Sequence, residues 1–267
     1  MVGMAPELKI PLLDHNLNEE SAFTASALME SVRSLRGMEQ EALPKICVLE
    51  FDGDLTDWLV SQGLASQVAD WACFHTNMYA VDCGGVRVGV IARTIGGPYA
   101  VLIAEQLHAA GVGLIVGLTS AGRIAPGLPL PCLVVASSAV RDEGTSFHYL
   151  SPEESVACPT AIVEELKRAL QVTGWTVKSG RVWTTDAPYR EPESAIQHWA
   201  SQGVLAVEMQ AASLFAFGFA RQANVAVVAM VSNAVDHSGE QFNTGTQADG
   251  WGILQAIARA GSAYLAG

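Results

Sequence analysis

The chain has 267 residues, 50% of them hydrophobic and 16% charged, a composition typical of one large packed domain and not of a disordered or fibrous chain. Its 27 acidic residues outnumber 15 Lys and Arg, which gives a formal net charge of -12. This balance argues against nucleic acid as a partner, because a phosphate backbone is bound by clustered cations.

The five cysteines are odd in number and form no CxxC pair, so neither a metal site nor a disulfide framework is indicated. No stretch of about 18 uninterrupted apolar residues occurs, and the N-terminus lacks a basic start followed by an apolar core. We therefore expect a cytoplasmic protein that uses no metal and does not bind membranes.

Residues 1–44 are expected to form an N-terminal extension to a main domain at 45–267. A helix is predicted from Glu19 to Leu35, closed by Gly37 and followed by Pro44. The stretch "FTASALMESV" places apolar residues at helical spacing, which predicts that the extension packs on the domain.

After the extension, short β-branched runs alternate with helical patterns. Strands are predicted at 45–51, 86–92, 113–118, 131–140, 175–184, 204–209 and 225–232. Helices are predicted at 98–110, 159–171, 193–202, 211–223 and 247–265. This alternation predicts a single-domain α/β fold of three layers, with helices on both sides of a mixed, largely parallel sheet.

In such a sheet, ligands bind outside the carboxyl ends of the strands. That rule selects the segments "FDGDLTD", "RTIGGP", "TSAGRI", "TTDAPYRE", "EMQ" and "SNAVDHSGE", each of which follows a predicted strand. The GGP turn precedes a helix whose free N–H groups suit an anion or a carbonyl, although an ordinary helix start has the same pattern. In "TSAG", a ligand could approach the backbone of Ser120 and Gly122.

The segment "VEMQAASLFAF" raises a separate question, because Glu208 and Gln210 follow an apolar run. Burying a carboxylate and an amide costs several kcal/mol unless each finds a partner. Either the fold satisfies these side chains internally or they await a ligand.

Taken together, these segments resemble the nucleoside phosphorylase family, which includes uridine phosphorylases and trimeric or hexameric purine nucleoside phosphorylases. The resemblance covers roughly residues 46–265 and rests on the order GGP-helix, "TSAG", "SSAVRDEGTSFHY", "TTDAPYRE", "VEMQAASLFAF" and a strand ending in "VSN". It implies a pentosyltransferase that takes a nucleoside and inorganic phosphate as co-substrate, with no further cofactor. It also implies a homo-oligomer with active sites near subunit interfaces.

For the ribose, the family has a Glu-Met-Glu motif after a strand. By resemblance, Met209 packs under the sugar and Gln210 takes the place of the Glu that grips its hydroxyls. An amide offers one acceptor and two donors, so the grip of Gln210 should be weaker. Glu208 is assigned to the same site, or else it is a strand-end acid bonded to backbone.

For phosphate, the resemblance assigns Gly53 in the Gly-Asp loop and the hydroxyl of Ser120. The family's arginines are missing: the region of Asp57 replaces the first, and Gly117 stands where the second would fall. Phosphate without a guanidinium or ammonium group is poorly held. Arg93, before the GGP turn, is our candidate replacement; Arg123 is a second nearby cation, and either could instead be a surface arginine.

For the base, Tyr189 is the expected stacking residue, Arg190 the expected donor to a base carbonyl, and Gly122 is placed on the same side. Asp186 is a turn or cap residue, or a ligand. At the leaving group, purine enzymes of the hexameric type carry an Asp where this chain has Asn233. An amide hydrogen-bonds a departing base but gives up no proton at neutral pH. Asp236 is the candidate proton donor in this loop, and His237 is either a second one or solvated.

Three functions follow from this reading. The first is a nucleoside phosphorylase that releases free base and ribose 1-phosphate. The second is a nucleoside hydrolase on the same fold, favoured by the missing arginines, with its base among Glu50, Asp52 and Asp54. The third is a nucleoside-binding protein without catalysis.

Overall fold

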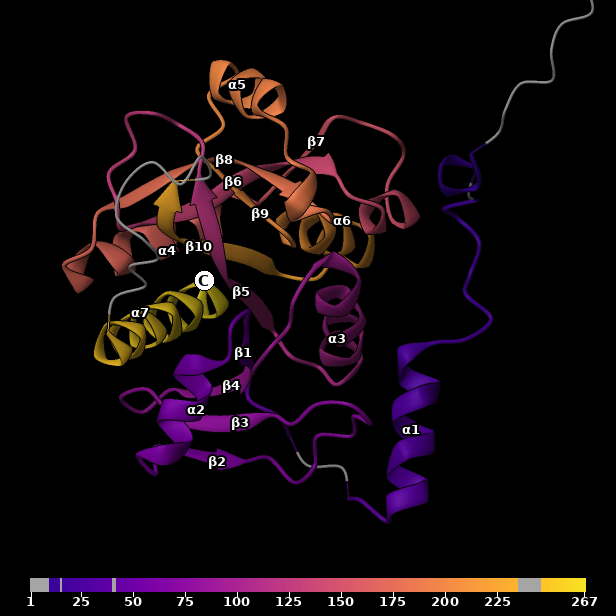
Figure 1. The fold of residues 1–267 in the computed structure, drawn as a ribbon. Helices are drawn as coiled ribbons and strands as arrows, with labels where there is room; N and C mark the ends of the chain where they lie inside the picture. The colour runs from indigo at the N-terminus through magenta and orange to yellow at the C-terminus, as the bar shows by residue number, and fades with distance from the viewer. Residues whose placement is uncertain (1–9, 15, 40–41, 235–245) are drawn as a thin grey trace, which may run out of the picture.

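The computed structural model describes residues 10–14, 16–39, 42–234 and 246–267. Within these ranges, a mixed 10-stranded sheet forms the centre of the fold (Figure 1). Its strands are β1 Ile46–Glu50, β2 Ala65–Gln67, β3 Tyr79–Asp82, β4 Arg87–Ile91, β5 Leu114–Arg123, β6 Cys132–Asp142, β7 Ser155–Ala157, β8 Val177–Thr185, β9 Ala206–Glu208 and β10 Val225–Ala234.

The helices lie on both sides of this sheet. They are α1 Ala25–Arg36, α2 Asp54–Ser61, α3 Gly97–Ala109, α4 Thr160–Leu170, α5 Glu193–Ser201, α6 Ala211–Arg221 and α7 Gln247–Ala266, with short 3₁₀ turns η1 Pro11–Leu13, η2 Thr145–His148, η3 Gln171–Thr173 and η4 Pro188–Arg190. Helix α7 contacts α4 and α2 on one side, and α3 contacts α6 and α1 on the other (Figure 1). The expected α/β architecture is therefore confirmed.

The sheet is curled, which the sequence did not predict. Parallel pairs join β4–β1–β5–β10 and β6–β8–β9, whereas antiparallel pairs join β2–β3–β4, β6–β7, β6–β10 and β5–β9. Because β5 is bonded to both β9 and β10, the strands β5, β10, β6, β8 and β9 close into a ring. The closure brings the carboxyl ends of β1, β5 and β10 beside the chain that follows β8 and β9.

The central strands are largely apolar, as is typical of strands covered on both faces. Every residue of β1, "ICVLE", is buried. Helix α4 is amphipathic instead, with Ile162, Val163, Leu166 and Leu170 turned to the core. A capping box between Thr246 and Asp249 starts α7.

Each strand and helix predicted for the main domain is present, with ends shifted by a few residues. Strands β2, β3 and β7 and helix α2 were not predicted, and the expectation that "FDGDLTD" is a loop was wrong, because α2 begins at Asp54. The first helix was also placed too early. It starts at Ala25 because the Thr24 hydroxyl accepts a hydrogen bond from the Ala27 N–H, at 3.2 Å.

Helix α1 packs against the body of the protein. Met29 and Val32 are buried in the main core, and α1 contacts α3. Among the described residues, no helix has both the length and the apolar character needed to cross a bilayer.

The burial of Met29 tests whether α1 unfolds together with the domain. The substitution Met29→Ala should lower the free energy of unfolding by about 2–5 kcal/mol, because it removes buried methylenes and leaves a cavity. Urea unfolding followed by circular dichroism measures this loss, and Glu30→Ala, on the exposed side of α1, is the matched control. Equal stability of the two variants would show that α1 detaches before the domain unfolds.

Candidate functional site

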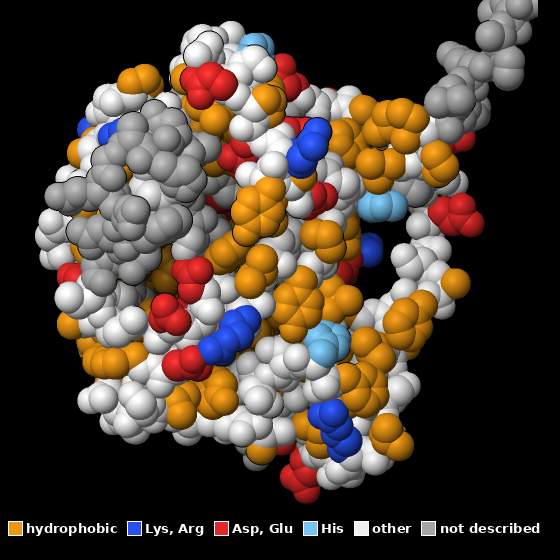
Figure 2. Space-filling view, viewed as in Figure 1, with side chains coloured by type: hydrophobic (Ala, Val, Ile, Leu, Met, Phe, Trp, Pro, Cys, Tyr) orange, Lys and Arg blue, Asp and Glu red, His pale blue; other side chains and the backbone are white. Residues whose placement is uncertain are grey.

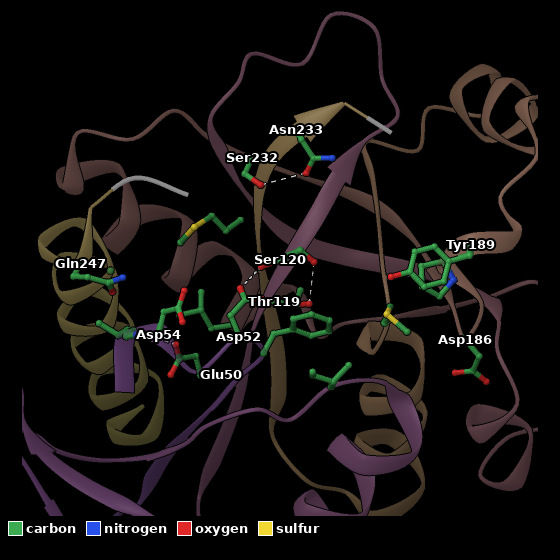
Figure 3. Close-up of a pocket in the computed structure, with 18 of the residues that line it drawn as sticks. Glu50, Asp52, Asp54, Thr119, Ser120, Asp186, Tyr189, Ser232, Asn233 and Gln247 are labelled. Carbon is green, nitrogen blue, oxygen red and sulfur yellow. Dashed lines mark hydrogen bonds between the residues drawn. The ribbon is translucent and has the colours of Figure 1, made fainter. Parts of the chain in front are cut away.

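A cavity of about 950 Å³ opens at the carboxyl ends of β1, β5 and β10 (Figure 3). The start of α7 and the turn η4 complete its walls. Its lining consists of Glu50, Phe51, Asp52, Asp54, Leu55, Ile95, Leu118, Thr119, Ser120, Asp186, Ala187, Pro188, Tyr189, Arg190, Met209, Met230, Ser232, Asn233, Thr246, Gln247 and Gly250. Most of the lining thus comes from the segments that the strand-end rule selected, and the start of α7 supplies Thr246, Gln247 and Gly250.

Glu50, the last residue of β1, fixes the acidic end of the cavity. Its carboxylate accepts hydrogen bonds from the Leu55 N–H at 2.8 Å, from the Thr56 N–H at 3.0 Å and from the Thr56 hydroxyl. Burial raises the pKa of Glu50, and these hydrogen bonds act in the opposite direction. Because both carboxylate oxygens of Glu50 accept hydrogen bonds from the first turn of α2, the role of Glu50 is structural.

Asp52 and Asp54 are the two exposed carboxylates at this end. The Ser120 hydroxyl on β5 donates a hydrogen bond to Asp52, which joins two strand ends across the cavity floor (Figure 3). Asp54 begins α2, and among the described residues no hydrogen bond or ion pair engages its carboxylate. Figure 2 shows acidic side chains gathered on the face of the molecule that carries α2.

Arg93, our candidate phosphate ligand, does not line the cavity. Its guanidinium donates to both carboxylate oxygens of Asp57 on α2, and it lies against Gly53. Gly53 is buried, with φ +95°, between the two lining acids. The expected grouping of Gly53, Arg93 and Ser120 around one anion is therefore not formed, because Asp57 binds the arginine.

At the end of β9, Glu208 is bonded within the fold, whereas the next residue, Met209, lines the cavity. Glu208 accepts hydrogen bonds from the Thr184 hydroxyl at 2.5 Å and from the N–H groups of Gln210 and Ala211 at 2.7 and 2.9 Å. It therefore caps α6, and burial raises its pKa to about 7. Of the two alternatives for Glu208, the structure shows the one in which the carboxylate is bonded within the fold. Met209 is half-buried and lines the cavity, as expected.

The expectation that Gln210 faces the cavity is wrong. Its side chain is fully buried, and neither Oε1 nor Nε2 has a hydrogen-bond partner among the described residues. A Cβ atom at Gly117 would lie 3.3 Å from Gln210 Nε2 and 3.2 Å from side-chain atoms of Leu214 and Val227. The missing side chain at 117 leaves the space that the Gln210 amide fills.

The opposite end of the cavity carries most of the expected base residues. Tyr189 lies on η4, exposed and across from the acidic end (Figure 3). Arg190 is the next residue of the same turn and is also exposed. Asp186 lines the cavity and also accepts a hydrogen bond at 2.9 Å from the N–H of Gly144, which lies 42 positions earlier in the chain. Gly122 is outside the lining, on β5 beside Asn233.

Asn233 lies at the end of β10 and lines the cavity. Its Nδ2 donates to the Ala234 carbonyl at 3.3 Å and its Oδ1 accepts from Ser232 at 3.3 Å. Asp236 and His237 lie outside the described residues, so their expected roles are not placed.

Positive charge is scarce at this site. Arg190 is the single Lys or Arg in the described lining. Residues 235–245, "VDHSGEQFNTG", contain neither Lys nor Arg. Among the described residues, no group of three or more His, Cys, Asp or Glu side chains could hold a metal ion.

Several lining residues were not predicted. Phe51, Ile95 and Met230 supply apolar wall, and their signal was only their position at the end of a strand. Thr246 and Gln247 enter with the start of α7, where the "TQAD" capping pattern marks a helix N-terminus. That pattern was available in the sequence and could have placed these two residues.

Comparison with known proteins identifies the family. Residues 45–261 match the family model described as the phosphorylase superfamily. The chain is 29% identical over 132 residues to a guanosine phosphorylase of Halorubrum lacusprofundi, which is 49% of this chain and 55% of that protein. It is 32% identical over 115 residues to a uridine phosphorylase of Thermococcus kodakarensis, 43% of this chain and 40% of that protein. The chain spans 40 to 61% of the length of three curated relatives it matches.

The fold has a solved counterpart. The crystal structure of uridine phosphorylase from Vibrio fischeri ES114 aligns with 85% of this chain and 93% of its own, with a TM-score of 0.66 and 22% sequence identity. The family match covers every described residue of the cavity lining. The resemblance found in the sequence is therefore confirmed, and the chain belongs to the phosphorylase superfamily.

Proposed function

We propose that this protein cleaves the N-glycosidic bond of a nucleoside and that the attacking nucleophile is water. We choose water over phosphate because of the charges at the cavity floor. Its strand-end floor presents Asp52 and Asp54, and the arginine beside it is bound to Asp57. A phosphate dianion at this floor would meet carboxylates without a cation, whereas water needs a general base and no cation.

The shape and lining support a nucleoside as the substrate. Apolar side chains of Phe51, Leu118, Met209 and Met230 line a cavity of about 950 Å³, large enough for a sugar and a base. Tyr189 offers an aromatic face and Arg190 a hydrogen-bond donor at the mouth. The names of the curated relatives, guanosine phosphorylase and uridine phosphorylase, support the same substrate class.

Asp52 is the best-placed base. Of the three acids at this end, Glu50 has both oxygens engaged at α2, and Asp54 makes no contact with β5 in the described hydrogen bonds. Asp52 is oriented by the Ser120 hydroxyl and remains exposed to the cavity. In the proposed reaction it takes a proton from water as the oxygen bonds to C1′ of the ribose.

The bond from C1′ to the base breaks with its electron pair going to the base nitrogen. Asn233 stands at the end of β10 with an amide that can donate a hydrogen bond to the departing base. Such a donor stabilises charge that develops on the base in the transition state. An amide does not deliver a proton, so the reaction favours a base that leaves as a stabilised anion or takes its proton from water.

Phosphorolysis is the second candidate, and a specific observation favours it. Both curated relatives compared above are named phosphorylases, and the Ser120 hydroxyl is present at the cavity floor as the resemblance requires. In that case the phosphate needs a cation at the floor, where the described lining has only carboxylates as charged groups.

Product analysis separates the two candidates. We expect incubation with a panel of purine and pyrimidine nucleosides to give free base and free ribose at a rate that inorganic phosphate does not increase. Chromatography of the base and a reducing-sugar assay measure the products. Ribose 1-phosphate that increases with phosphate concentration would establish phosphorolysis instead. Calorimetric binding without any product would indicate a binding protein.

The role of Asp52 has a matched test within the same loop. Asp52→Asn should lower kcat/KM by roughly 10²- to 10⁴-fold, the usual contribution of a general base. Asp54→Asn, which removes a neighbouring lining carboxylate without a contact to Ser120, should change it far less. If both variants lose activity equally, the floor acts through its total charge and Asp52 is not the base.

Tyr189 should contribute through its ring. Tyr189→Ala should raise KM for the nucleoside roughly 10-fold, because stacking on an aromatic side chain is worth about 1–3 kcal/mol per base. Tyr189→Phe keeps the ring and should leave KM near the wild-type value. Steady-state kinetics with one nucleoside decides this, and a KM unchanged in Tyr189→Ala would remove Tyr189 from the base site.

A further inference from the structure

The pair formed by Arg93 and Asp57 lies directly beside the acidic end of the cavity. Arg93 follows β4, and Asp57 is in the first turn of α2. Both side chains are more than half exposed, at 56% and 59%, yet the guanidinium meets both carboxylate oxygens of Asp57. An exposed ion pair adds little stability, so stability alone gives no reason for this arrangement.

The backbone around Arg93 is held in an unusual conformation. Arg93 has φ 59°, in the left-handed region that residues other than glycine rarely occupy. The next residue, Thr94, is buried, and its N–H and hydroxyl both donate to the Glu50 carbonyl, at 3.0 and 3.1 Å. The start of the Arg93 side chain is therefore fixed, and the direction of its far end depends on its partner.

The side chain of Arg93 crosses Gly53. Its Cγ, Cζ and Nη1 atoms lie 2.8–2.9 Å from the position that a Cβ atom on Gly53 would occupy. Gly53 is the residue between Asp52 and Asp54, which line the cavity. Asp52 and Asp54 are the chain neighbours of the glycine that Arg93 crosses, and the Ser120 hydroxyl is bonded to Asp52. A guanidinium released from Asp57 can therefore turn toward these groups.

We propose that Asp57 selects the nucleophile: by holding Arg93 away from the cavity floor, it withholds the cation that an anionic nucleophile such as phosphate needs. The inference rests on the proposed hydrolysis. Asp57 acts here as a positioning residue, since it touches Arg93 and not the substrate. The same contact that neutralises Arg93 thus leaves the floor to water and its base.

The test measures how tightly the intact chain binds inorganic phosphate. Asp57→Asn removes the charge but keeps the shape of the side chain. We expect it to bind phosphate at least tenfold more tightly than the wild type in calorimetry. With nucleoside and phosphate together, it should form ribose 1-phosphate beside ribose. Asp57→Glu should behave as the wild type, because it restores the carboxylate.

Two further variants give the controls. Adding Arg93→Gln to Asp57→Asn should return phosphate affinity to the wild-type level, because the freed cation is gone. Glu165→Gln removes the partly buried carboxylate that pairs with Arg168 on α4, at 2.8 Å, and produces the same change in net charge outside the cavity lining. Thermal unfolding shows that each variant is folded.

The outcomes separate this inference from the proposed function. Asp57→Asn that binds phosphate no better than Glu165→Gln overturns the role of Asp57. The role of Asp57 is also overturned if phosphate binding stays tight in the double variant, or if the wild type already binds phosphate tightly. A wild type that hydrolyses no nucleoside contradicts the proposed function alone, because the phosphate affinities still test Asp57.

Discussion

The site depends on one buried carboxylate. Glu50 ends a strand whose residues are all buried, and it immediately satisfies two free N–H groups and one hydroxyl of the next helix. The N–H groups of a helix start attract negative charge, so the carboxylate and α2 stabilise each other. Its carbonyl also receives both bonds of Thr94. Through these contacts, Glu50 fixes the loop of Asp52 and Asp54 and the start of Arg93.

The charges around this carboxylate explain the chemistry we propose. A nucleophile that carries its own negative charge needs fixed cations, whereas a neutral one needs an acceptor for its proton. The acceptor is present in Asp52, oriented from a second strand by Ser120. The cation is present too, but its charge is already satisfied by Asp57 on the same helix that Glu50 positions.

The sequence was most informative where a pattern is local. Strand runs and helical periods predicted the main elements, and the strand-end rule selected the segments that line the cavity. It failed where the outcome depends on distant partners. Gln210 is buried because Gly117, far away in the chain, has no side chain. Helix α2 was missed because it has only 8 residues, and the residue that stabilises its first turn, Glu50, belongs to the preceding strand.

The close fit of Gly117 and Gln210 also bears on how such a site could change in evolution. A new side chain at 117 would meet Leu214, Val227 and the Gln210 amide at 3.2–3.3 Å, within a layer that is already filled. A codon change to arginine there, the residue that the family resemblance places at this point of β5, would bring a charge into an apolar layer. It becomes tolerable only after position 210 has changed and its side chain has left that space. The two positions are therefore epistatic, and the order in which they can be substituted is set by packing.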